Sequence, residues 1–338
     1  MVCSVTGVSR ASRVPSPGCY AGPVHIPDGF LSAGVTAVTW AAAGAGVAAA
    51  LRAEKADPTP TPAGVLGAVA AFVFAAQMIN VPVAAGTSGH LVGAALSAVL
   101  LGPWRAVIVM TVVLAVQALL FQDGGLTALG ANITDMGLAA SLSGYAVAAL
   151  AARGAASARA RVVGGVLGAF VATLAAAVLT ALWLGLSGLY PLLPIVHLML
   201  VTHVAIGLLE AALTGAVLAT LIRWRPDMVR GVGADGRISS SGAFASGALG
   251  IAIAIAAFVS PLASGLPDGL DHAATRLGFA ARARASFAAP FPDYGLPFDA
   301  SPAFATAAAG VVGTVAVALI AWAVSRGVQS GGSDGSHR

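Results

Sequence analysis

The side chains that could do chemistry in this 338-residue chain are its histidines. His25 stands in VHIPDGFLS, directly before a long apolar run, and His90 stands in INVPVAAGTSGHLVGAAL. Imidazole nitrogens bind transition metals, whereas Mg(II) and Ca(II) prefer oxygen ligands. Two histidines from distant parts of the sequence that meet in one cavity would therefore indicate a transition-metal site. The six histidines are His25, His90, His197, His203, His272 and His337.

The loop before His90 suggests how this residue could reach such a cavity. Its glycines break the preceding helix, and Thr87 or Ser88 is placed to cap the next one. The apolar segment 90–102 is too short to cross a membrane as a straight helix. Because irregular backbone at membrane depth must be buried in protein or line a cavity, we expect the loop to dip in from outside. His90 would then lie at the floor of an outward-facing cavity with His25, unless it only hydrogen-bonds within a packed bundle.

Composition places these histidines in a membrane protein. The chain is 58% hydrophobic and 9% charged, with a mean hydropathy of +0.90, whereas a soluble domain carries about 25% charged residues. Its 42 glycines are typical of membrane helices that pack closely through small side chains. We predict an all-α, polytopic transmembrane bundle of about nine spans, seven in a body and two after it. The apolar segments are residues 30–51, 64–84, 90–102, 104–121, 136–152, 162–186, 194–222, 243–263 and 303–324.

Basic residues give this bundle an orientation. If the segments alternate across the membrane, eleven basic residues fall on one side, which the positive-inside tendency makes cytoplasmic. Arg276, Arg282 and Arg284 are exceptions in the outer loop. We therefore expect VHIPDG outside and the C-terminus in the cytoplasm. The eleven are Arg52, Lys55, Arg105, Arg153, Arg159, Arg161, Arg223, Arg225, Arg230, Arg237 and Arg326.

Other kinds of site are excluded by the residues. Cys3 and Cys19 both precede residue 24, so the body carries no disulfide framework and no cysteine-based metal site. Lys55 is the single lysine and follows no glycine-rich turn, so the chain has no phosphate-binding loop. Any ATP that drives transport must be hydrolysed by another subunit. No HExxH zinc motif occurs, and we expect no organic cofactor and no nucleic-acid partner.

Polar stretches divide the chain. Residues 1–23 lack the apolar run of a signal peptide and are expected to be a mis-assigned start or a removed extension. Residues 24–225 form the predicted metal-binding body. Residues 226–243 are a cytoplasmic linker rich in Gly and Ser, residues 244–326 a two-span unit, and residues 327–338 a disordered tail.

Four motifs in order support a family comparison. VHIPDGFLS, FVFAAQMINVPVAAGTSGHLVGAALSAVLLGPW, VQALLFQDGGLTALGANITDMG and HVAIGLLEAALTG closely resemble signatures of the CbiM/NikM family. Members are substrate-binding (S) subunits of cobalt/nickel energy-coupling factor (ECF) transporters. The resemblance covers about residues 24–225. The later segment PDGLDHAATRLGF resembles the PDGLE segment of the small NikN/CbiN accessory subunit, here fused, with Asp271 where that segment usually has Glu.

The resemblance implies a set of nitrogen donors. In that family the mature chain begins at the position of Val24. The implied donors are the free amine of Val24, the backbone nitrogen and imidazole of His25, and the imidazole of His90. Four nitrogens in a plane suit a tetragonal Ni(II)-type site. Because a nitrogen inside a peptide bond is no free amine, we predict that the functional chain starts at residue 24, translated from a GTG start codon, or that residues 1–23 are removed.

Other polar residues are expected to support this site. Carboxylates and amides near metal-binding histidines commonly orient the imidazole rings, although Asp28 could instead cap the first helix. The expected orienting residues are Asp28, Gln77, Asn80 and Ser88, and the accessory candidates are Asp268, Asp271 and His272.

The resemblance also implies partner subunits and a direction of metal transport. The chain would capture Co(II) or Ni(II) as bound substrate from outside a bacterial plasma membrane, for cobalamin synthesis or nickel enzymes. Translocation would require a transmembrane coupling subunit of the CbiQ/NikQ type and ATPases of the CbiO/NikO type, in contact with membrane lipid. The sequence does not choose between the two metals, because nitrogen donors bind both.

Two other functions remain open from the residues alone. Gly86-Thr87-Ser88-Gly89 matches the short GxSG pattern of rhomboid-like intramembrane serine proteases, with Ser88 as nucleophile and His197 or His203 as base. A non-catalytic assembly subunit without metal is the second alternative. For His197, His203 and Glu210, which lie on one predicted helix, we expect a structural role.

Overall fold

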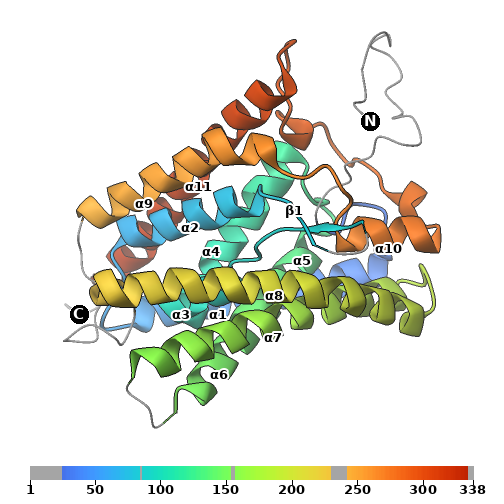
Figure 1. Cartoon of the computed structure of the whole chain (residues 1–338). Helices are drawn as coiled ribbons and strands as arrows, with labels where there is room; N and C mark the ends of the chain where they lie inside the picture. The colour runs from blue at the N-terminus through green and yellow to red at the C-terminus, as the bar shows by residue number, and fades with distance from the viewer. Residues whose placement is uncertain (1–24, 84–85, 154–156, 230–241, 334–338) are drawn as a thin grey trace.

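The chain folds into a bundle of helices with very little sheet (Figure 1). The computed structural model describes residues 25–83, 86–153, 157–229 and 242–333. Val24 and the predicted extension 1–23 lie outside the described residues, as does most of the predicted linker. The main elements are α1 (Ala33–Ala56), α2 (Ala63–Gln77), β1 (Val81–Pro82), β2 (Ser88–Gly89), α3 (Ala94–Leu101), α4 (Pro103–Val116), α5 (Leu129–Asn132), α6 (Ala140–Ala151), α7 (Ala158–Leu186), α8 (Leu192–Trp224), α9 (Gly242–Ala254), α10 (Gly269–Leu277) and α11 (Pro302–Ser333).

Short irregular turns join or extend several of these helices. Some are π-helical and continue a helix: Gln117–Phe121 follows α4, Ile133–Ala139 joins α5 to α6, and Ile255–Val259 follows α9. The remaining turns are 3₁₀ helices at Pro226–Met228, Ser260–Leu262, Ala280–Arg282 and Pro292–Tyr294.

The predicted apolar segments all contain helix, which confirms the polytopic bundle. In the described part of the chain, seven helices are long and apolar enough to cross a membrane. α2 is shorter, with 15 residues, and α3 has only 8. At a rise of 1.5 Å per residue, α3 is about 12 Å long. The third segment is therefore too short to span, as expected from its sequence.

Small residues bring the helices close together. α7 packs against both α6 and α8, while α2 packs against α9 and α11 (Figure 1). A Cβ atom added to Gly164 on α7 would lie 2.6 Å from the carbonyl oxygen of Ala148 on α6. Only glycine allows that approach, which is the packing mode typical of membrane helices.

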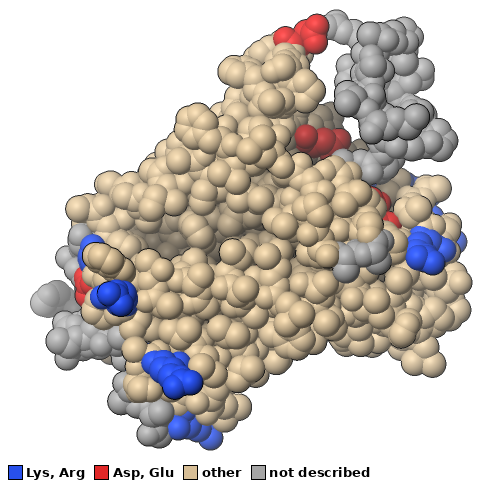
Figure 2. Space-filling model, viewed as in Figure 1, with Lys and Arg blue, Asp and Glu red and all other residues tan. Residues whose placement is uncertain are grey.

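Charged side chains collect at the ends of the bundle. Figure 2 shows basic groups at two ends of the visible face, separated by an uncharged surface. α10 lies at one end of the bundle (Figure 1). The apolar surface between the ends includes highly exposed side chains such as Leu208 and Phe258, as expected for helices that face lipid.

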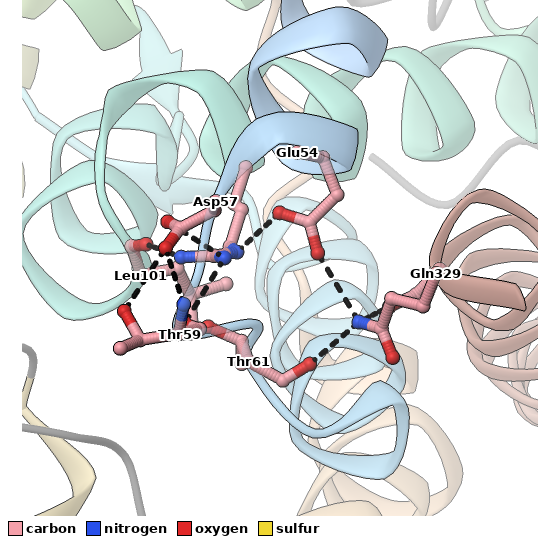
Figure 3. A network of polar contacts seen from close by, with 8 residues as sticks. Glu54, Asp57, Thr59, Thr61, Leu101 and Gln329 are labelled. Carbon is pink, nitrogen blue, oxygen red and sulfur yellow. Dashed lines mark hydrogen bonds and ion pairs between the residues drawn. The ribbon is translucent and has the colours of Figure 1, made fainter. Parts of the chain in front are cut away.

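A buried polar network ties the last helix to the first one (Figure 3). Arg105 forms ion pairs with Glu54 and Asp57. Gln329 on α11 donates from Nε2 to Glu54 Oε1 at 3.2 Å and to the carbonyl oxygen of Thr61 at 2.9 Å. These bonds explain a difference from the sequence prediction, because α11 continues through Ser333 where a disordered tail was expected from residue 327.

Candidate metal centre

The segment from His25 to Asp28 is pinned against a distant loop. The backbone N–H of Ile26 donates to Asn132 Oδ1 at 3.0 Å, and Asn132 Nδ2 donates to the carbonyl oxygen of Ile26 at 3.2 Å. Gly125 N–H donates to that same carbonyl at 2.9 Å. The segment is buried, so these bonds replace the water it would otherwise require.

Glycine makes the close approach of these two loops possible. Gly124 has φ +95, a conformation that residues with a side chain rarely adopt. A Cβ atom at Gly124 would also lie 2.9 Å from the Cβ of His25. The pair of glycines in FQDGG thus allows His25 to lie against residue 123.

The His25 ring is held by a carboxylate. Its Nδ1 lies 3.0 Å from Oδ1 of Asp123, and both side chains are buried. Because an ionised carboxylate only accepts hydrogen bonds, the ring proton is on Nδ1. This fixes the tautomer that leaves a lone pair on Nε2. The Nε2 atom is buried, and no described residue forms a hydrogen bond with it, so its lone pair is available to a ligand.

The His90 ring lies close to the His25 ring. His90 follows β2, and its Nδ1 donates to the carbonyl oxygen of Leu91 at 3.0 Å, which leaves Nε2 as the acceptor nitrogen. The ring centroids of His25 and His90 are 5.8 Å apart. With metal–nitrogen distances of about 2 Å, one ion can touch two rings whose centroids are roughly 4.5 to 6 Å apart. The structure thus brings together the two histidines that the sequence singled out.

Both rings line a cavity of about 60 Å³. Its wall also contains His203 and Asp135 from the spanning helices and Asp268 from the loop before α10. Within the described residues, no three His, Cys, Asp or Glu side chains form a group that could hold a metal ion.

The electrostatics of the site favour a neutral imidazole at His90. Loss of water around the ring, together with the neighbouring His25, lowers the pKa of His90 to about 4. Burial alone would raise the pKa of Asp123, but the charge and hydrogen bond of His25 hold it below the usual value. Burial would lower the pKa of His25, and Asp123 raises it above the usual value.

Glu210 positions the segment that carries His90. Its carboxylate accepts hydrogen bonds from the backbone N–H groups of Val92 at 2.6 Å and Gly93 at 2.9 Å, just before α3. A carboxylate at a helix N-terminus accepts hydrogen bonds from free N–H groups and is attracted to the positive end of the helix dipole. Thr87 and Ser88 do not cap this helix, because it begins at Ala94 after Gly93 in a left-handed conformation. The structural role expected for Glu210 is confirmed.

The predicted orienting residues make other contacts. Asp28 Oδ1 accepts from the backbone N–H and hydroxyl of Thr127 at 2.7 and 2.6 Å. Gln77 Nε2 donates to the carbonyl oxygen of Val92 at 2.7 Å, immediately before α3. These two residues position the backbone around the site, while Asp123 is the residue that bonds to a histidine ring.

Asn80 and Ser88 connect the site to the C-terminal part of the chain. The carbonyl oxygen of Asn80 accepts from Ser264 N–H at 2.8 Å. The backbone N–H of Ser88 donates to the Pro267 carbonyl at 2.8 Å, and its hydroxyl donates to the Leu266 carbonyl at 2.7 Å. The loop that carries the PDGLD motif therefore closes over the segment before His90.

The accessory candidates divide between the cavity and the surface of the loop. Asp268 lines the cavity, caps α10 by accepting from Asp271 N–H at 2.7 Å, and has its pKa raised to about 7 by burial. Asp271 and His272 lie in the first turn of α10 and do not line the cavity. Of the three candidates, the structure thus places Asp268 beside His25 and His90.

The geometry required for a serine protease is not formed in the described part of the chain. The Ser88 hydroxyl donates to a backbone carbonyl, and His203 Nδ1 donates to the Met199 carbonyl at 2.7 Å. His197 is exposed on α8. No hydrogen bond among the described residues joins Ser88 to either histidine. His203 instead lines the same cavity as His25 and His90.

Sequence reasoning missed Asp123, Asn132 and Tyr294. Asp123 and Asn132 stand inside a motif that the family comparison quoted, but their partners lie 98 and 106 residues away. Tyr294 donates from its hydroxyl to Asp123 Oδ2 at 2.9 Å. The available sequence signal for Asp123 was a single carboxylate followed by two glycines after an apolar run.

Comparison with known proteins gives consistent matches. Residues 25–228 match the family model "CbiM: Cobalt uptake substrate-specific transmembrane region", and residues 242–330 match "PDGLE domain". The "Putative fused nickel transport protein NikMN" of Archaeoglobus fulgidus is 34% identical to this chain, over 90% of this chain and 98% of its own length. The cobalt transport protein CbiM of Geobacter sulfurreducens is 34% identical over 68% of this chain and 69% of its own.

A solved structure gives the same result. The crystal structure of a truncated transition metal transporter superposes with a TM-score of 0.54 at 35% identity, covering 59% of this chain and 98% of that one. The matched part is about the size of the predicted body.

Proposed function

Because the chain belongs to the CbiM family of cobalt uptake transmembrane proteins and carries a PDGLE domain behind that region, we propose that it captures Co(II) or Ni(II) at His25 and His90. The chain is a multi-pass membrane protein and a component of a metal transporter rather than an enzyme. The observation that supports the site most is that His25, whose buried Nε2 has no hydrogen-bond partner among the described residues, shares a cavity with His90. The metal is the cargo, held until it is passed on.

The donor set of the proposed site has four nitrogens. Two are the imidazoles of His25 and His90, and the other two are the backbone nitrogen of His25 and the amine of Val24. The two imidazoles lie with their ring centroids 5.8 Å apart, and the amine and the backbone nitrogen would complete the set. A planar set of nitrogens favours Ni(II)-type tetragonal coordination over an oxygen-seeking cation.

The proposed amine donor requires a chain that starts at residue 24. Mass determination of intact, transport-competent protein should give the mass of residues 24–338. A mass that includes residues 1–23 on protein that transports metal would contradict the amine donor, while leaving the two imidazoles in place.

We further propose that import is driven by ATP through partner subunits. The chain lacks a phosphate-binding loop, so a transmembrane coupling subunit and ATPases of the ECF type would supply the energy. Eleven basic residues fall on one side of the membrane if the apolar segments alternate, against three in the outer loop, which supports a cytoplasmic C-terminus and an outward-facing metal cavity in a bacterial plasma membrane.

Uptake by cells tests this function. Cells that express the chain with coupling and ATPase subunits should accumulate radioactive Co(II) or Ni(II), and substitution of the ATPase catalytic residues should abolish that accumulation. Unchanged uptake with the inactive ATPases would contradict the ATP-driven mechanism. The ratio of the two metals taken up decides between cobalamin supply and nickel-enzyme supply.

A further inference from the structure

The C-terminal unit reaches the metal cavity through the loop between α9 and α11. This loop bonds to three segments of the body: the residues near Asn80, those near Ser88 and those near Asp28. The last contact is an isolated antiparallel bridge in which Arg284 N–H donates to the Asp28 carbonyl at 2.8 Å. The loop is therefore packed against the same segments that hold the two histidines.

One side chain of this loop enters the hydrogen-bond chain of the site. The hydroxyl of Tyr294 donates to Oδ2 of Asp123 at 2.9 Å. The other oxygen of that carboxylate, Oδ1, faces Nδ1 of His25 at 3.0 Å. Tyr294, Asp123 and His25 thus form a continuous chain that ends at the His25 ring, whose Nε2 has no hydrogen-bond partner among the described residues and which lines the cavity.

The position of Tyr294 is fixed by aromatic packing. Its ring stacks on Phe121 with centroids 4.6 Å apart and planes 15° from parallel. Phe291 stacks on the same ring, and its backbone N–H donates to the Leu120 carbonyl at 2.9 Å. Asp293 and Tyr294 both have positive φ, at 52 and 57, which is uncommon for residues with side chains. The surrounding contacts therefore hold the turn in the conformation that brings the hydroxyl to Asp123.

In this contact the Tyr294 hydroxyl donates the hydrogen bond and the Asp123 carboxylate accepts it. Burial raises the pKa of the Tyr294 phenol well above its ordinary value, so the phenol remains a hydrogen-bond donor. By binding one carboxylate oxygen, it restricts rotation of Asp123 and presents the other oxygen to His25. Second-sphere bonds of this kind set the tautomer and orientation of metal-binding histidines.

We propose that Tyr294 is a positioning residue of the metal site, contributed by the fused PDGLE unit and acting on His25 through Asp123. The proposal rests on metal binding at His25 and His90. The fused unit would then contribute directly to the metal site, because loss of its loop would release the Asp123 carboxylate that orients the His25 ring. A chain with the loop displaced would bind metal more weakly, and return of the loop would tighten binding.

The test uses Tyr294→Phe in the protein that begins at residue 24 and keeps the rest of the chain, purified in lipid nanodiscs. Phenylalanine keeps the ring stack and removes only the hydroxyl. Ni(II) titration calorimetry should show a loss of affinity of about tenfold or more, and the visible spectrum of bound Ni(II) should change because the donor set is reoriented. Tyr145→Phe, on an exposed face of α6, is the matched control and should leave both readings unchanged.

A double-mutant cycle separates positioning from a general effect on folding. Asp123→Asn should lose affinity by itself, and Tyr294→Phe added to it should cause little further loss, because the two residues act in one chain. Additive losses in the cycle would overturn the proposal, as would a Tyr294→Phe protein with wild-type affinity and spectrum. If the wild-type protein itself binds no Ni(II) or Co(II), it is the proposed function that fails.

Discussion

His25 Nδ1 and Asp123 Oδ1 lie 3.0 Å apart although 98 residues separate them in sequence. The contact joins the segment before α1 to the loop that follows the π-helical turn Gln117–Phe121. It decides which nitrogen of His25 faces the cavity. The ring cannot rotate freely while this bond is made, so a ligand meets a fixed lone pair.

Removal of the Asp123 charge should weaken metal binding. Asp123→Asn preserves shape, but an amide accepts a weaker hydrogen bond and leaves His25 without its charged partner. We expect Ni(II) or Co(II) affinity to fall about 10- to 100-fold in calorimetry. Asp227→Asn, in a half-exposed ion pair with Arg225, is the control and should bind normally. Equal affinities in the two variants would contradict the role of Asp123.

The glycine next to Asp123 should tolerate no side chain. Gly124→Ala places a Cβ close to that of His25 and forces an alanine into a positive φ. We expect the protein to remain helical by circular dichroism but to lose most of its metal binding, because the two loops are pushed apart. Gly34→Ala, whose added Cβ meets nothing within 4 Å, should bind as the wild type does. Full binding by Gly124→Ala would show that the loops need not be so close.

The cap on α3 predicts a stability effect. Glu210→Ala leaves the N–H groups of Val92 and Gly93 without their acceptor, at a cost of about 1–3 kcal/mol for a buried group. We expect thermal unfolding at a lower temperature, measured by tryptophan fluorescence. Glu210→Gln keeps one acceptor oxygen and should lie between wild type and alanine. An unfolding temperature for Glu210→Ala equal to that of the wild type would contradict the capping role.

The buried network at the other end predicts a larger effect. Glu54→Gln removes one partner of the buried Arg105, and breaking such a pair costs about 3–5 kcal/mol. Asp227→Ala breaks a half-exposed pair, worth about 0–1 kcal/mol, and serves as the comparison. Chemical unfolding in detergent measures both differences. Similar losses would mean that the network of Figure 3 is not buried in the native protein.

The helical segments could be predicted from sequence because the signal is local, although nine spans were expected and seven described helices are long and apolar enough to cross a membrane. Apolar runs between basic and glycine-rich stretches mark spanning helices whatever their partners, and the short third segment follows from its length alone. The π-helical turns and the continuation of α11 through Ser333 could not be predicted in this way. Both depend on tertiary contacts, such as the bonds of Gln329 to Glu54 and Thr61.

Sequence reasoning singled out the two histidines that the structure brings together, but it did not find the residues that hold them. His25 and His90 stand out because an imidazole is rare in an apolar chain and chemically distinct. Asp123 and Tyr294 do not stand out, because their importance lies in bonds across 98 and 171 residues. Asp28, Gln77, Asn80 and Ser88 were chosen for their nearness in sequence to the histidines, and the structure uses them to hold backbone segments instead.

Metal content measured on protein that begins at residue 24 tests the central claim most directly. Wild-type protein and three alanine variants, at His25, at His90 and at the exposed His197, would be loaded with Ni(II) or Co(II), desalted and analysed by mass spectrometry for metal. We predict close to one ion per chain for the wild type and for His197→Ala, and almost none for His25→Ala and His90→Ala. Equal metal in all four proteins would contradict the assignment of the site.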